Sequence, residues 1–246
     1  MAKLKGFFEK ITGRRLFVIL LAILIGAGAI TSACLYHINA GYQAAKDEYA
    51  ELRSISLVVM APRGSGGIDM DPTPDVDLRE INPSYVFWLK INGTEIDYPV
   101  VQGKDNEYYM FRTFRGEKNA AGTPFMDIRC PGGLEAPLAI VYGHNMHDGS
   151  MFAALHSYRN STYFLDHSDI TVTPYEGKPL TYRIFAVLLT DVYDEIFELR
   201  GGSRQDIFSY CAGLGKPSGS GGVLVLSTCT TGGSDNERLL VFSAEI

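Results

Sequence analysis

The sequence predicts a mainly β protein, a closed or nearly closed β-barrel preceded by one membrane-spanning helix. From residue 78 onward, short apolar runs alternate with turn residues, and only two brief stretches show helical spacing. This pattern is typical of barrels built from many short strands. One long uncharged run stands earlier in the chain, directly after a basic cluster. With 246 residues, 46% of them hydrophobic and 20% charged, the composition indicates one sizeable globular domain with accessory segments.

The charge of the chain is unevenly distributed. Residues 1–15 contain five Lys or Arg and one Glu, a net charge of +4, so the remaining chain carries −10 of the total −6. Binding to phosphate backbones needs a basic surface, which a body this acidic lacks. We therefore expect no nucleic-acid partner.

The uncharged run Leu16–Tyr36 predicts a signal anchor. At about 1.5 Å per residue it spans roughly 31 Å, the thickness of a bilayer core. The preceding positive charge places the N-terminus in the cytoplasm and the remaining chain outside. We therefore expect a cytoplasmic tail over residues 1–15, a transmembrane segment over 16–38 and a single-pass protein of the cell membrane with its folded domain outside the cell.

Two other roles for this segment stay open. Ala27-Gly28-Ala29 could serve, weakly, as the small-x-small site of a cleavable signal peptide. Thr31-Ser32-Ala33-Cys34 could be a lipoprotein signal, although Thr is a poor residue three places before a lipidated Cys. The length of the apolar run and its basic flank favour the uncleaved anchor.

Residues 39–77 predict a stalk helix and a linker between the span and the folded domain. Apolar residues recur there at intervals of three, four and seven, a helical stripe that we expect to pack on the domain. The stripe consists of Tyr42, Ala45, Tyr49, Leu52 and Val59. Residues 61–77 are rich in Gly, Ser and Pro without periodicity, as in a linker or long surface loop. The folded domain is then expected over residues 78–246.

The barrel itself is predicted from apolar runs bounded by turn residues. The first two runs flank an Asn92-Gly93 turn and therefore predict a hairpin. The expected strands are Val86–Ile91, Ile96–Val101, Leu138–Tyr142, Ile170–Pro174, Leu180–Thr190, Val223–Ser227 and Leu239–Ala244. Helical spacing is limited to Ser150–Tyr158 and to Ser203–Cys211, the latter ending near Gly213.

Three residues with chemical potential stand at ends of these strands. Cys229 ends the Val223 strand and opens onto a polar loop, where a rigid scaffold can present a nucleophile. His144 follows another apolar run after Gly143, which allows an unusual backbone or a close approach. An imidazole beside a thiol can form the thiolate and later protonate a leaving amine. Arg238 begins the return strand nine residues after Cys229, where a cation can stabilise an oxyanion.

Each of these residues also has a plainer interpretation when it is taken alone: a core cysteine, a hydrogen-bonded structural histidine, and a solvated arginine on an edge strand. His144 and His147 with a cysteine could suggest zinc, but no further ligand spacing supports it, so we predict no metal and no cofactor. Asp127, Asp148 and Asp191 are available carboxylates, yet none is spaced to complete a His–Asp pair.

The other cysteines have different settings. Cys34 lies in the predicted span, Cys211 has the spacing of a core residue in a short helix, and Cys130 precedes Pro131-Gly132-Gly133 in a loop. A domain outside the cell can form disulfides, so a bridge between Cys130 and Cys211 stays open. No framework spacing of cysteines supports it.

Several motifs together resemble the class B sortases, membrane-anchored cysteine transpeptidases of Gram-positive bacteria. Leu226-Ser227-Thr228-Cys229 is similar to the family's Leu-x-Thr-Cys signature, Tyr142-Gly143-His144-Asn145-Met146 resembles its histidine motif, and Arg238 matches its arginine. The segments Asp97-Tyr98-Pro99-Val100-Val101 and Asp105-Asn106-x-Tyr108-Tyr109-Met110 also resemble class B sequences. The resemblance covers roughly residues 78–246, and several independent motifs in the expected order make it specific.

The resemblance implies a sortase-type eight-stranded β-barrel with a helix at its N-terminus and another in the connection 190–222 before the cysteine strand. It implies cleavage of the C-terminal sorting motif of a secreted protein after Thr, a thioester on Cys229, and transfer to an amine, in class B usually that of a peptidoglycan precursor of the lipid II type. His144 would move protons and Arg238 would hold the substrate and its developing charge. The implied substrate-binding positions are Asn106, Met110, Tyr142, Thr190, Tyr193 and Ser227.

Other functions stay open at this point. Some class B members polymerise pilins instead of anchoring proteins to the cell wall. Water competes with the amine for the same thioester, so a hydrolase that releases surface proteins would carry the same residues. A membrane-tethered β-barrel that only binds its partner, with an incidental cysteine, is the non-catalytic alternative; rapid reaction of Cys229 with a thiol probe would exclude it.

Overall fold

The structure is a computed structural model that describes residues 13–59, 77–130, 132–215, 217, 219, 221–230, 234 and 236–246. The chain forms two compact units, Met1–Ala44 and Ala45–Ile246. The predicted tail up to residue 12 and the predicted linker over 61–76 lie outside the described residues.

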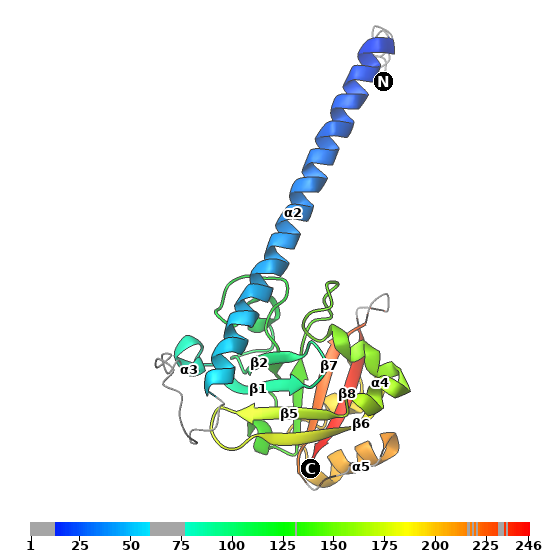
Figure 1. Ribbon diagram of the computed structural model, residues 1–246. Helices are drawn as coiled ribbons and strands as arrows, with labels where there is room; N and C mark the ends of the chain where they lie inside the picture. The colour runs from blue at the N-terminus through cyan, green and yellow to red at the C-terminus, as the bar shows by residue number, and fades with distance from the viewer. Residues whose placement is uncertain are drawn as a thin grey trace. The chain divides into compact units, whose positions relative to one another are not determined.

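A single helix, α2, runs without interruption over Gly13–Val59 (Figure 1). In its first part the large apolar side chains from Leu16 to Ile38 are exposed. By length and composition this helix is able to cross a membrane. The predicted span and the predicted stalk are therefore parts of one helix.

The last turns of α2 belong to the second unit. Three of the five residues of the predicted apolar stripe, Ala45, Tyr49 and Leu52, are buried there. The side chain of Val59 lies outside the described part of the chain. The hydroxyl of Tyr49 donates to the main-chain oxygen of Gly122 at 2.5 Å, and burial raises the pKa of this phenol. Lys46 forms an ion pair with Asp148 at 3.0 Å.

Eight strands close into a barrel in the order β1-β2-β3-β4-β7-β8-β6-β5, which confirms the predicted fold class. The β2–β3 and β4–β7 pairs are parallel, and all other pairs are antiparallel. The strands are β1 Tyr85–Ile91, β2 Asp97–Val101, β3 Phe125–Met126, β4 Leu138–Tyr142, β5 Asp169–Pro174, β6 Leu180–Asp191, β7 Val223–Cys229 and β8 Glu237–Glu245. Six of them contain a predicted run in full, and β2 begins at Asp97, one residue after the predicted start at Ile96. Strand β3, with two residues, is too short to show alternation.

The helices of the second unit are short. Besides the end of α2 they are α3 Leu78–Ile81, η1 Tyr108–Phe111, η2 Gly133–Glu135, η3 Ala153–Arg159, α4 Ser161–Asp166, η4 Glu195–Phe197 and α5 Arg204–Leu214. Helix α5 begins after Ser203, whose hydroxyl accepts from the Asp206 N–H, so the predicted helix in the connection before β7 is present.

The predicted helix over Ser150–Tyr158 is different in the structure. A 3-10 helix, η3, begins only at Ala153, because Met151 has a φ of 57°, in the left-handed region that an α-helix cannot contain. The segment then continues into α4, which the side chain of Asn160 caps by accepting from the Thr162 and Tyr163 N–H groups. The sequence does not reveal this second helix because it has only six residues.

Cys130 and Cys211 are both buried in one apolar cluster with residues of β4, β7 and β8. Both are free thiols, so the disulfide that the sequence left open is not formed in this structure. Burial raises the pKa of each thiol to about 11, which keeps both thiols protonated and unreactive at neutral pH.

Candidate active site

The register of β7 and β8 places Cys229 beside Arg238. These two residues are directly opposite partners at the end of the antiparallel ladder, and the two strands run side by side in Figure 1. The spacing of nine residues predicted such a return. Cys229 is the last residue of β7 and the only exposed one in that strand, so its thiol is accessible while its strand is held in the core.

His144 reaches the same edge of the sheet through β4. This strand runs parallel to β7 with Tyr142 opposite Ser227, and the Gly143 N–H extends the pairing by donating to the Ser227 oxygen at 3.1 Å. The chain therefore leaves β4 where β7 ends, and it carries His144 with it.

The imidazole of His144 is oriented by the segment around η1. Its Nε2 lies 2.6 Å from the main-chain oxygen of Met110, and the Phe111 ring lies 5.6 Å from it between centroids. A carbonyl oxygen only accepts hydrogen bonds, so Nε2 carries a proton in this geometry. Nδ1 is then the ring nitrogen that can exchange a proton with a thiol or an amine.

Gly143 has a steric function in this segment. A Cβ at this position would lie 2.5 Å from Cγ of Phe152, closer than carbon atoms pack. Phe152 is fully buried, and its N–H donates to the His144 oxygen at 2.9 Å. The close approach that the sequence suggested at Gly143 is thus the packing of the main chain next to His144 against the buried ring of Phe152.

The main chain at Cys229 is held by His156, a residue that no sequence motif marks. Nε2 of His156, in η3, donates to the Cys229 oxygen at 3.0 Å. Beyond Cys229, the hydroxyl of Thr230 donates to the Glu237 carboxylate at 2.5 Å and ties the end of β7 to the start of β8.

Cys229, His144 and Arg238 all line one cavity of about 420 Å³. Four of the six predicted substrate-binding residues line it too: Asn106, Met110, Tyr142 and Ser227. The other two lie elsewhere. Thr190 pairs with Arg238 in the β6–β8 ladder and hydrogen-bonds Asp194, and Tyr193 is exposed.

The cavity also has walls that the sequence did not indicate. Arg129, Val192, Phe197, Glu198 and Arg200 line it, and all of them belong to loops or to the short helix η4, where no periodicity marks a functional residue. Among the described residues, no group of three His, Cys, Asp or Glu is arranged to hold a metal ion.

Two hydroxyls beside Cys229 are buried without a hydrogen-bond partner among the described residues. They belong to Ser227 and Thr228, which are 1% and 2% exposed and line the cavity. Buried hydroxyls are normally bonded in folded proteins. Because strand residues alternate between faces, Ser227 lies on the same face of β7 as Cys229, and its hydroxyl is the one placed to hydrogen-bond a ligand that fills the cavity.

The family model of the Sortase domain matches residues 89–246. Sortase B of Listeria monocytogenes is 36% identical over 166 residues, which cover 63% of this chain and 66% of that protein, just under two thirds of its length. The X-ray structure of Clostridium perfringens sortase B matches with a TM-score of 0.61 at 34% identity and covers 69% of this chain and 97% of that one. A Streptococcus pyogenes class B sortase involved in pilus biogenesis matches with a TM-score of 0.61 at 27% identity, covering 69% and 96%.

Proposed function

This chain belongs to the sortase family of cysteine transpeptidases, in class B, and we propose that Cys229, His144 and Arg238 carry its reaction. The substrate is a secreted protein with a C-terminal sorting motif that contains Thr, and the acceptor is an amine of a peptidoglycan precursor. The observation that supports this most directly is the meeting of a nucleophile, a proton carrier and a cation at one sheet edge and in one cavity.

The proposed reaction proceeds through an acyl-enzyme. The thiolate of Cys229 attacks the carbonyl carbon of Thr, and the charge that develops on the carbonyl oxygen is stabilised by the guanidinium of Arg238. The C–N bond breaks as Nδ1–H of His144 protonates the leaving amine, and the thioester remains. The acceptor amine, deprotonated by Nδ1, then attacks the thioester carbon, the C–S bond breaks, and the thiolate is regenerated.

Peptide binding in the cavity is supported by its chemistry. The Ser227 hydroxyl has no partner within the described part of the chain and can bond a main-chain group of an extended peptide beside Cys229. Asn106, Met110 and Tyr142 line the same cavity and are proposed substrate contacts. Thr190 and Tyr193 are proposed contacts for parts of the substrate that extend beyond it.

We also propose that α2 anchors the enzyme as a single-pass membrane protein, with the N-terminus in the cytoplasm and the barrel outside. The basic residues before Leu16 and the exposed apolar side chains of α2 support this topology. Protease added to intact cells should digest the barrel and spare the N-terminal tail. A mature chain that begins after Ala33 would show that the segment is a cleaved signal instead.

The decisive experiment is incubation of the enzyme with a panel of sorting-motif peptides and a small amine, read by mass spectrometry. Wild type should give a thioester on Cys229 and an amide product. Cys229→Ala should give neither, while Cys34→Ala, which removes the other exposed thiol, should react like wild type. Thioester formation by the Cys229→Ala variant would contradict the proposal. A second cargo, pilin subunits, is favoured by the likeness to the Streptococcus pyogenes enzyme, and a pilin lysine peptide as acceptor tests it.

His144→Ala and Arg238→Ala should fail in different ways. Loss of the proton carrier should slow both acylation and aminolysis, whereas loss of the cation should mainly slow acylation and leave Cys229 open to small alkylating agents. Arg238→Lys should restore only part of the rate, because an ammonium keeps the charge and loses the planar fork of donors. Single-turnover acyl-enzyme formation measures acylation, and the rate at which the added amine converts the thioester to the amide product measures aminolysis. Full activity of Arg238→Ala would leave only a Cys–His pair.

A further inference from the structure

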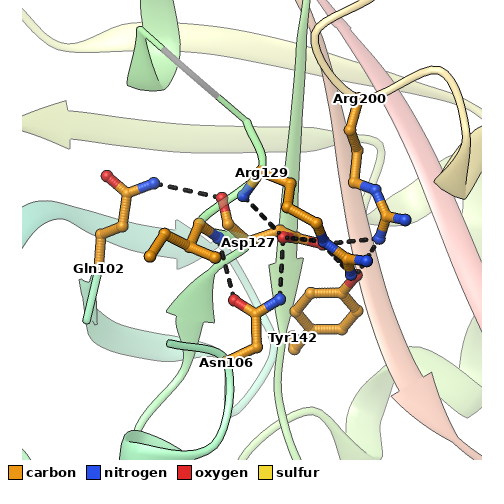
Figure 2. A network of polar contacts seen from close by, with 7 residues as sticks. Gln102, Asn106, Asp127, Arg129, Tyr142 and Arg200 are labelled. Atoms are coloured by element: carbon orange, nitrogen blue, oxygen red, sulfur yellow. Dashed lines mark hydrogen bonds and ion pairs between the residues drawn. The ribbon is translucent and has the colours of Figure 1, made fainter. Parts of the chain in front are cut away.

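Asp127 is the centre of a polar network (Figure 2) whose other members include residues that line the cavity. It follows β3 directly, and its side chain is fully buried. Its Oδ1 accepts from Nδ2 of Asn106 at 2.9 Å and from the main-chain N and Nε of Arg129 at 2.9 and 3.0 Å. Its Oδ2 accepts from Nη2 of Arg129 at 3.0 Å, from the Tyr142 hydroxyl at 2.7 Å and from Nη1 of Arg200 at 2.8 Å.

These contacts saturate the carboxylate. Two carboxylate oxygens offer about four lone-pair positions, and six donors converge on them here. Burial by itself would raise the pKa of Asp127, but the donors, with Arg129 foremost, outweigh it and hold this pKa well below the usual range. Asp127 is therefore ionised at neutral pH, and it has no proton to exchange in a reaction there.

The donors come from four separate segments, and all of them line the cavity that contains Cys229. Asn106 precedes η1, Arg129 follows β3, Tyr142 ends β4, and Arg200 lies between η4 and α5. Asp127 does not line the cavity itself. Asp127 thus contacts residues that line the cavity without facing the substrate position itself.

Arg200 is the member that depends most on Asp127. Its side chain is only 9% exposed, whereas that of Arg129 is 57% exposed. The guanidinium of Arg200 also lies 5.5 Å from the Phe197 ring centroid. Two guanidinium groups approach one carboxylate here, so removal of the carboxylate would leave two like charges close together, with Arg200 shielded from water. The anion therefore keeps Arg200 beside the Tyr142 hydroxyl, 3.5 Å from its Nη1, and leaves one net positive charge in this network.

We propose that Asp127 is a positioning residue for the transpeptidation reaction. By holding Arg200, Tyr142 and Asn106, it fixes the wall against which the carbonyl-rich backbone of the substrate peptide lies. The proposal rests on the proposed function, and it predicts an effect on substrate affinity that is transmitted through Arg200. The chemistry at Cys229 should continue once the peptide is bound.

The test compares Asp127→Asn, Arg200→Gln and the double variant in steady-state cleavage of the sorting-motif peptide. The matched control is Asp169→Asn, which breaks a similar two-point Asp–Arg pair, with Arg183, outside the cavity. Asp127→Asn should raise KM roughly tenfold with little change in kcat, since it alters binding before chemistry. The KM of the double variant should be no higher than that of Asp127→Asn alone, because the two residues act as one unit. The control variant, Asp169→Asn, should have the KM and kcat of the wild type.

Two further measurements separate positioning from loss of the fold. Thermal melting reports folding, and the rate of iodoacetamide reaction with Cys229 reports an intact nucleophile; both should stay near wild type in Arg200→Gln even if Asp127→Asn unfolds. An unchanged KM in folded Asp127→Asn or in Arg200→Gln, or a fall in kcat at constant KM, overturns the positioning role. A wild-type enzyme that cleaves no peptide overturns the proposed function itself, and the two failures are thus distinguishable.

Discussion

Replacing Gly143 by alanine should disable the site by moving the segment that carries His144. The added Cβ would lie 2.5 Å from Cγ and 2.6 Å from Cδ2 of Phe152, whereas non-bonded carbons rest about 3.5–4.0 Å apart. Phe152 is fully buried, so the main chain at 143–144 must move by about 1 Å. Overpacking of this kind costs about 1–3 kcal/mol of the free energy of unfolding, and a misplacement of about 1 Å lowers a catalytic rate about a hundredfold.

Two assays measure these effects separately: kcat/KM for peptide cleavage and the free energy of unfolding in urea. The matched control is Gly213→Ala in α5, where a Cβ would have no neighbour within 4 Å. That substitution should stabilise the protein by about 0.5–1 kcal/mol, because alanine loses less entropy in a helix than glycine, and it should not change the rate. If Gly143→Ala keeps the wild-type kcat/KM, then His144 does not depend on the contact of its backbone with Phe152.

Three further predictions follow from burial and charge. Thiol reagents should label Cys229 well before Cys130 and Cys211, whose pKa values burial raises to about 11; equal rates of labelling would contradict the assignment of the nucleophile. Tyr49→Phe should lower the free energy of unfolding by about 1–2 kcal/mol, measured in urea, because the Gly122 carbonyl loses its donor in a buried place. The pKa of Asp127 is lower in the folded state than in the unfolded state, where it is about 3.9. Asp127 should therefore stabilise the fold at pH values above about 3.9. This stabilisation should be lost as the pH falls from there toward the pKa of the folded state, because the unfolded state then binds more protons. An acid titration followed by circular dichroism should therefore show that the wild type loses its folded structure more steeply with falling pH than Asp127→Asn does.

The parts of this fold that the sequence predicted are those set by neighbouring residues. The run Val223–Leu226 is continuously apolar because β7 lies between β4 and β8 and is buried everywhere except at its last residue, Cys229. Asn92-Gly93 marks a hairpin turn, and Gly93 has the positive φ of 77° that such a turn requires. The helical spacing of Ser203–Cys211 was also a local signal, and α5 covers Arg204–Leu214 in the structure. Each of these features depends on a few consecutive residues.

The parts that the sequence did not predict depend on contacts between distant residues. Asp127 appeared only as a carboxylate without a histidine partner, because its hydrogen-bond partners Tyr142, Asn106 and Arg200 lie 15, 21 and 73 positions away. Only closure of the barrel brings them together. Strand β3, the short segment that leads to Asp127, has two residues and carries no periodic signal.

The sequence indicates that Cys229 and His144 both stand at strand ends. Two residues at the ends of neighbouring strands lie close together only if the strands are parallel. The carboxyl ends of parallel neighbours meet at one edge of a sheet, whereas those of antiparallel neighbours lie at opposite edges. Strands β4 and β7 are parallel, because the chain between them crosses back through β5, β6 and α5. Strand β8 is antiparallel to β7 and therefore begins at the edge where β7 ends, which brings Arg238 there. One parallel pair and one antiparallel return thus place all three groups at one edge, and an inverted β4 would leave Cys229 and Arg238 together without His144.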